Sequence, residues 1–160
     1  MKKEKTKKIV SILFALYIPV LVFILFLYRV RTGETFEIER FSEEHFNMVN
    51  FIPFATIISF FERAAEGAIN KDIVVRNMAA NLLMFIPMGM ALPVLFEKKF
   101  NKLWKMVVFM LVLVSIIEVT QFLTFYGSAD IDDLILNVVS AVIGYGIVQI
   151  RFVRRILKLS

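Results

Sequence analysis

Long runs of apolar residues are the feature that most restricts what this chain can fold into. Residues 9–28 form twenty consecutive residues without a charge, and three later stretches of similar length carry at most one charge each. A bilayer core about 30 Å thick requires about 20 apolar helical residues to cross it. The 160 residues, 59% of them hydrophobic, leave room for four such crossings with modest loops. The sequence therefore predicts an all-α membrane protein with one integral membrane domain over residues 1–160.

The four transmembrane helices are expected at residues 9–28, 73–96, 106–125 and 134–150. The first follows five lysines, and its apolar run is too long for the core of a signal peptide, so we interpret it as an uncleaved signal-anchor. Pro87 and Pro93 should bend the second. The long polar loop before the second span contains a shorter apolar run, 51–61, with Pro53 near its start. This run is too short to cross, which indicates an interfacial or re-entrant helix.

The distribution of lysine and arginine predicts the orientation. Thirteen of the nineteen lie in the N-terminal tail, the 97–105 turn and the C-terminal tail. The other six lie in the long loop or at Arg76, in a region that also holds eight of the fourteen acidic residues. Cytoplasmic loops carry the excess of basic residues, so both termini are expected in the cytoplasm. Because the positive charge of +5 gathers beside apolar runs, it indicates membrane topology and not a nucleic-acid partner.

The composition removes several kinds of chemistry. No cysteine is present, which excludes disulfides, thiolate catalysis and metal binding through sulfur. His45 is the only histidine, so a multi-histidine metal site is also excluded; in its polar, acidic loop it is expected to be a surface residue.

Polar side chains inside the expected spans require an explanation, because an unpaired polar group in hydrocarbon is costly. They recur at helical spacing, three or four residues apart, and so share helix faces. The stripes are Asn77 with Asn81; Ser115 with Glu118 and Gln121; and Asp133 with Asn137. These side chains are therefore expected to face protein or a water-filled cleft.

The depth of these residues indicates where such a cleft would open. With a rise of about 1.5 Å per residue, Glu118 lies about 18 Å from the cytoplasmic start of its span and about 12 Å below the outer surface. Asn81 is expected at a similar depth, since its span starts outside. The other polar residues are expected nearer the outer surface, at Asn77 and Asn137, with Asp130, Asp132 and Asp133 at the rim. The pattern predicts one polar cleft open to the outside.

Structural roles for the same residues remain open at this stage. Asparagine and glutamine in membrane helices often serve as hydrogen-bond contacts between helices. The three aspartates can form a solvated turn in which Asp130 or Asp132 caps the last helix. Glu118 favours a functional role, because a buried carboxylate is a poor choice for holding helices together.

The ordered set of these residues resembles the VanZ-like family of bacterial membrane proteins. The resemblance rests on Asn50-Phe-Ile-Pro-Phe, Asn81-Leu-Leu-Met-Phe-Ile-Pro-Met-Gly, Glu118 with Gln121, and Asp130-Ile-Asp-Asp-Leu-Ile-Leu-Asn137, within residues 46–146. Ser140 departs from the glycine expected there, but it is small enough for close helix packing. The resemblance implies a bacterial plasma-membrane protein linked to low-level resistance to teicoplanin, a lipid-bearing glycopeptide antibiotic.

Three functions fit this pattern. The first is recognition of a lipid-linked envelope precursor or lipid-bearing antibiotic in the outward cleft. The second is an enzyme acting on a lipid-linked substrate, with desolvated Glu118 as general base and Mg²⁺ or Ca²⁺ at the aspartate rim as a secondary option. The third is a small transporter or flippase. The candidate ligand-binding residues are Asn50, Arg76, Asn77, Asn81, Gln121, Asp130, Asp132, Asp133 and Asn137.

Overall fold

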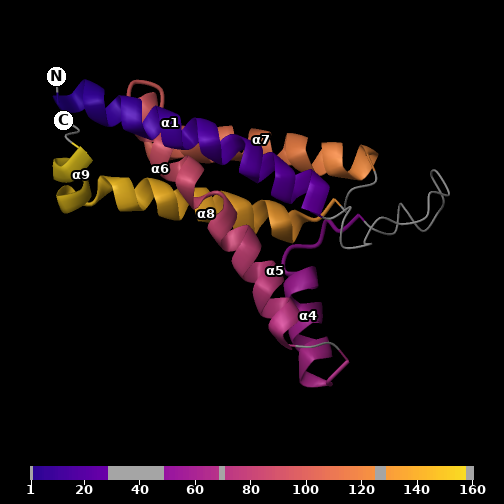
Figure 1. Ribbon diagram of the computed structural model, residues 1–160. Coiled ribbons are helices and arrows are strands. Elements are labelled where there is room, and N and C mark those ends of the chain that lie inside the picture. Colours follow the sequence, from indigo (N-terminus) through magenta and orange to yellow (C-terminus); the bar gives the residue numbers. More distant parts are fainter. Residues whose placement is uncertain (1, 29–48, 69–70, 125–128, 158–160) are drawn as a thin grey trace.

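The computed structural model describes residues 2–28, 49–68, 71–124 and 129–157, which are almost entirely helical (Figure 1). The elements are α1 (Lys2–Val22), the π-helix η1 (Phe23–Tyr28), α4 (Ala55–Ala65), α5 (Lys71–Met84), α6 (Ile86–Leu95), α7 (Leu103–Leu123), α8 (Ile131–Gln149) and α9 (Arg151–Leu157). His45 and most of the polar loop before residue 49 lie outside the described residues.

Four segments are long and apolar enough to cross a membrane: Lys3–Phe26, Met78–Leu95, Leu103–Leu123 and Ile131–Gln149. The prediction of an all-α membrane protein with four transmembrane helices is thus confirmed. The short helix expected in the loop before the second span is α4.

The exposed surface of the bundle is apolar, as a lipid environment requires. On α7, Val112, Ile116 and Val119 are each more than half exposed. The opposite face of the same helix is buried and carries Met106, Met110, Val114, Glu118 and Gln121. In water such an exposed apolar face would be a liability, whereas in a bilayer it contacts acyl chains.

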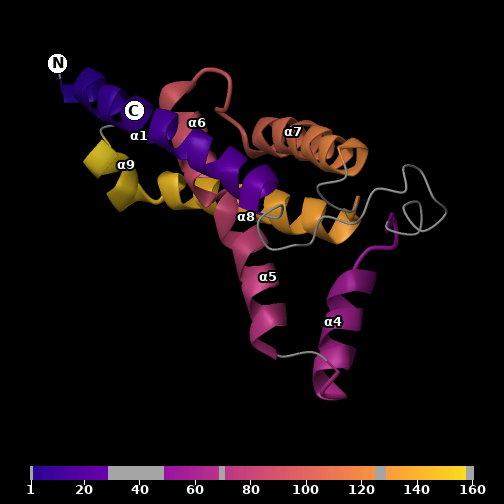
Figure 2. The same ribbon diagram turned by 45° about the vertical axis from the view of Figure 1, so that its right-hand side comes forward.

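Helix α8 organises the fold, because α5, α6 and α7 all pack against it while α1 packs on α6. The views in Figures 1 and 2 show α1, α7 and α8 running alongside one another. Helices α4 and α5 form a hairpin that extends away from these three in both views. Both chain ends lie at one end of the bundle (Figure 1).

Helices α6 and α8 cross so closely that only glycine fits at the contact. A Cβ added at Gly89 would lie 2.0 Å from the carbonyl oxygen of Ala141, and one at Gly144 would lie 2.2 Å from the carbonyl oxygen of Ile86. Small residues allow such approach between membrane helices, which gain their stability from packing and not from the exclusion of water.

The second span is broken between α5 and α6, at Phe85. Pro87 causes the break, since proline lacks an N–H and its ring collides with the carbonyl four residues earlier. Other helices satisfy the backbone at this point. The Tyr17 hydroxyl donates to the Met84 carbonyl over 2.8 Å, and the Phe85 N–H donates to Ser140 Oγ over 3.0 Å. The predicted bend at Pro87 is therefore a true interruption, whereas α6 continues through Pro93.

Replacing Gly89 by alanine is expected to destabilise the protein, because the new methyl group would overlap the Ala141 backbone. Overpacking of this kind costs about 1–3 kcal/mol. Thermal unfolding in detergent measures the loss. Gly146→Ala is the matched control, since nothing lies within 4 Å of a Cβ at that position. Equal melting temperatures for the two variants would contradict the close crossing of α6 and α8.

Candidate functional site

The three aspartates at the start of α8 each hold a different part of the chain. Asp130 is the N-cap of α8, and its side chain accepts a hydrogen bond from the Asp132 N–H over 2.9 Å. Asp130 is 8% exposed and Asp132 only 1%. The capping role considered from the sequence is thus correct for Asp130, but the Asp130 and Asp132 side chains are buried and not solvated, and Asp133 is half-buried.

The segment before α4 pairs with the residues that lead into α8. The Asn50 N–H donates to the Ala129 carbonyl over 2.9 Å, and the Asn50 carbonyl accepts from the Ile131 N–H over 3.0 Å. These two bonds form an isolated parallel bridge. The side chains add to it: Asn50 Nδ2 donates to Thr56 Oγ1 over 2.9 Å, and the Thr56 hydroxyl donates to Asp130 Oδ2 over 2.6 Å.

Asp132 of α8 caps the N-terminus of α4, where the N-cap residue itself makes no side-chain hydrogen bond. Phe54, the residue before α4, makes no side-chain capping bond. Its N–H donates to Asp132 Oδ1, and the Ile57 N–H donates to Asp132 Oδ2 over 3.1 Å. Phe54 has a φ of 68°, a left-handed conformation that costs a residue with a side chain about 1–3 kcal/mol. The Asp132 carboxylate therefore stabilises a strained backbone at the start of α4.

Asp133 completes the arrangement by accepting a hydrogen bond from Asn81 Nδ2 of α5. The start of α8 is thus bonded to the 49–54 segment, to α4 and to α5. We call this group the aspartate cluster; it consists of Asn50, Thr56, Asn81, Asp130, Asp132 and Asp133.

Three further polar side chains are buried between the helices: Glu118 and Gln121 on α7, and Asn137 on α8. Gln121, 1% exposed, donates from Nε2 to the Leu25 carbonyl within η1 over 2.8 Å. Gln121 therefore makes a hydrogen bond between helices, the structural role that the sequence analysis considered for amide side chains. Glu118 is 7% exposed and lies on the same inward face of α7.

Glu118 and Asn137 lie at similar distances from the ends of two helices that pack together. Glu118 is about 8 Å along the axis from the end of α7, and Asn137 is about 9 Å from the start of α8. Asn137 is 3% exposed, and its Oδ1 atom has no hydrogen-bond partner in the part of the chain that the structure describes. Burying an acceptor without a hydrogen bond costs the folded protein about 1–3 kcal/mol. A ligand that donates a hydrogen bond to Asn137 Oδ1 would therefore recover this free energy.

The candidate residue Arg76 is not brought into this arrangement, because it lies on α5 with an exposed side chain. Asn77 is also a candidate, and its side chain lies outside what the structure describes. The sequence analysis in turn missed Thr56 and Tyr17. Thr56 interrupts the apolar run 51–61, which is the signal that marks it, whereas a tyrosine within a first span carries no comparable signal.

The aspartate cluster does not fit a divalent cation. Among residues 2–28, 49–68, 71–124 and 129–157, no group of three or more acidic or histidine side chains is placed to hold a metal ion. Asp130 and Asp132 instead accept bonds from backbone N–H groups and from Thr56. Such carboxylates act as caps and are not directed at one shared point.

The fold and these buried polar groups define a multi-pass helical membrane protein with a carboxylate and two amides inside its bundle. The chain belongs to the VanZ/LLP1 family, whose model matches residues 14–153. No curated protein and no solved structure matches the chain.

Asp132→Ala is expected to loosen α4 from the bundle, because the Phe54 and Ile57 N–H groups lose their acceptor. Loss of a helix cap costs about 0.5–2 kcal/mol. Hydrogen exchange of the peptide covering residues 50–66 measures the effect as faster exchange. Glu62→Ala, on the exposed side of α4, serves as the control and should leave exchange unchanged. Unchanged exchange in Asp132→Ala would show that α4 is held by other means.

Proposed function

We propose that this protein lies in the bacterial plasma membrane with both termini in the cytoplasm and binds a lipid-linked or lipid-bearing ligand at its outer end. The ligand's polar part would reach Glu118 and Asn137, while its lipid chain stays in the bilayer. Family membership supports a link to glycopeptide resistance, and the ligand class proposed here includes teicoplanin and lipid-linked envelope precursors.

The orientation is supported by the basic residues at one end of the bundle. Glu97, in the turn between α6 and α7, lies 2.9 Å from Lys3 Nζ and 3.8 Å from Lys7 Nζ. The N-terminus, this turn and α9 therefore share one end, which carries the excess of lysine and arginine. By the positive-inside rule this end faces the cytoplasm, and the aspartate cluster faces outward.

The observation that carries the proposal is the buried, unpartnered Asn137 amide oxygen on α8, the helix that packs against α7 with its buried Glu118. Both groups accept hydrogen bonds, and in apolar surroundings each such bond is worth more than in water. Their natural partners are hydroxyl and amide N–H groups. Sugars and peptides, the polar parts of envelope precursors and of glycopeptides, are rich in both.

The segment next to the aspartate cluster supplies apolar surface for the same ligand. Phe51, Ile52 and Phe54 are 76%, 69% and 54% exposed. Their backbone is held by Asn50 and Asp132, so these side chains are presented from a fixed segment. An apolar rim beside buried acceptors suits an amphiphile whose chain remains in lipid.

The enzyme alternative keeps Glu118 as a base but lacks further support among the described side chains. Asp130 and Asp132, two of the aspartates considered for a metal, accept hydrogen bonds from backbone N–H groups, and Arg76, the one basic residue among the candidate ligand-binding residues, has an exposed side chain. Recognition needs only acceptors and shape, so it is the simpler proposal.

Glu118→Gln is expected to weaken ligand binding at least about tenfold, since a hydrogen bond to a charged group contributes about 1.5–3 kcal/mol. Asn137→Leu, which keeps volume and removes the acceptor, should act in the same direction. The measurements are the teicoplanin susceptibility of cells expressing each variant and the lipids that co-purify with the protein, identified by mass spectrometry.

Thr120→Val is the matched control on α7, because its hydroxyl donates to the carbonyl of Ile116 in the same helix, over 2.6 Å. It should behave as the unchanged protein. The proposal fails if Glu118→Gln and Asn137→Leu leave both teicoplanin susceptibility and the co-purifying lipids unchanged. It also fails if only bulk phospholipid co-purifies with the unchanged protein.

A further inference from the structure

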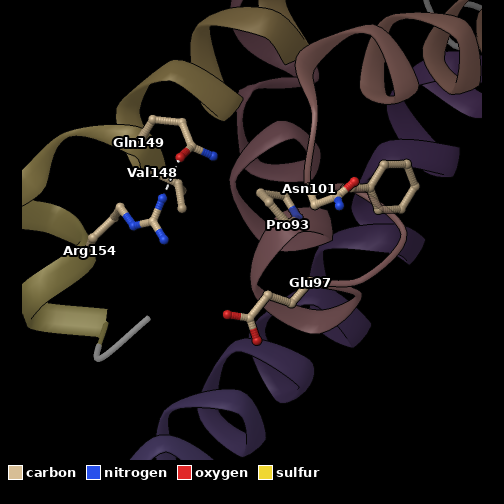
Figure 3. Close-up of a pocket in the computed structure, with 7 residues that line it drawn as sticks. Pro93, Glu97, Asn101, Val148, Gln149 and Arg154 are labelled. Carbon is tan, nitrogen blue, oxygen red and sulfur yellow. Dashed lines mark hydrogen bonds between the residues drawn. The ribbon is translucent and has the colours of Figure 1, made fainter. Parts of the chain in front are cut away.

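A cavity of about 140 Å³ lies at the opposite end of the bundle from the aspartate cluster (Figure 3). Arg154 of α9 and Gln149 of α8 lie on one side, Asn101 and Pro93 on the other, and Glu97 at the rim. The apolar part of the lining is Pro93, Phe100 and Val148. One water occupies about 30 Å³ in the liquid, so the cavity can hold a group of phosphate size.

We propose that this cavity binds the phosphate of an anionic phospholipid headgroup from the cytoplasmic leaflet. This site is separate from the outer ligand site and does not depend on it. The inference rests on the orientation of the amide side chains, on the charge at the rim, and on the depth of the cavity in the membrane.

Both amides of the cavity have their oxygen atoms engaged by cations. Gln149 Oε1 accepts from Arg154 Nη1 over 2.9 Å, and Asn101 Oδ1 accepts from Lys105 Nζ over 2.8 Å. An amide whose oxygen is held in this way presents its NH₂ group as a donor. The cavity therefore combines two oriented NH₂ groups with a guanidinium, a set of donors that matches phosphate oxygens.

Glu97 does not make the cavity acidic. Its carboxylate lies 2.9 Å from Lys3 Nζ and 3.8 Å from Lys7 Nζ, so two cations compensate its single charge. With Lys105 and Arg154 nearby, the local balance is positive, and an anionic headgroup is favoured over a neutral one.

The exposed aromatic residues beside the cavity indicate a lipid as the source of the phosphate. Trp104, in the first turn of α7, is 60% exposed, and Phe152 of α9 is 69% exposed. Aromatic side chains of this kind gather at the level of lipid headgroups. A headgroup therefore lies at the depth of the cavity while its acyl chains follow the apolar surface of the bundle.

Trp104, the single tryptophan of the chain, provides the readout. The purified full-length protein is placed in phosphatidylcholine vesicles, and quenching of Trp104 fluorescence by brominated phosphatidylglycerol is compared with quenching by brominated phosphatidylcholine. The unchanged protein should prefer phosphatidylglycerol. Arg154→Gln and Gln149→Glu should each lower this preference at least about tenfold, because each removes donors to a charged acceptor.

Arg155→Gln is the matched control. All three variants lower the net charge by one unit, so general attraction to an anionic surface predicts equal losses. Gln149→Glu also keeps the acceptor for Arg154, which preserves the contact between α8 and α9; thermal unfolding checks that it folds. Equal losses of the phosphatidylglycerol preference in all three variants, or no preference in the unchanged protein, overturn the proposal.

Competition with inorganic phosphate tests whether the ligand is a lipid. Millimolar inorganic phosphate should leave the preference for phosphatidylglycerol unchanged. Loss of the preference in its presence would overturn the assignment to a lipid.

Discussion

The absence of water from the hydrocarbon core is the constraint on which this structure depends. A regular helix satisfies its own backbone, but each irregularity frees groups that only another part of the protein can bond. Two examples among the described residues are the break between α5 and α6 and the π-helix η1. Tyr17 and Ser140 bond the freed groups at the first, and Gln121 bonds the Leu25 carbonyl at the second. These side chains lie on α1, α8 and α7, so each irregularity also fixes the position of a neighbouring helix.

The polar residues of the bundle consequently fall into two kinds. Those of the aspartate cluster, together with Gln121 and Ser140, are engaged in bonds that hold the fold. Asn137 differs, because its amide oxygen is buried without a partner among the residues described, and the buried Glu118 lies on α7, which packs against α8. The aspartate cluster lies at the start of α8, and Asn137 lies further along the same helix. The unpartnered Asn137 oxygen is the reason for proposing recognition there, whereas the bonds of the aspartates support the fold.

The sequence predicted the features that depend on local pattern. Apolar runs identified the four spans, the short run after Pro53 identified α4, and Pro87 marked the interruption of the second span. The partners of the aspartates could not be predicted in this way, because Asp132 bonds Phe54, which lies 78 residues away, and no periodicity links the two segments. The depth assigned to Asn81 assumed an upright helix, whereas α5 leans away from the bundle (Figure 2). Ser140 departs from the glycine expected there, and its hydroxyl bonds the Phe85 N–H.

The capping of α4 by Asp132 has a consequence for biosynthesis. A ribosome delivers α4 to the membrane well before it reaches residue 132, so the nascent helix begins at a left-handed phenylalanine with nothing to stabilise that turn. The same delay applies to Asn50, whose backbone partners follow it by about 80 residues. The end of the bundle that carries the aspartate cluster can close only when the last span has inserted. A chain that stalls before that point would leave α4 untethered, and quality-control proteases could distinguish it from the finished protein.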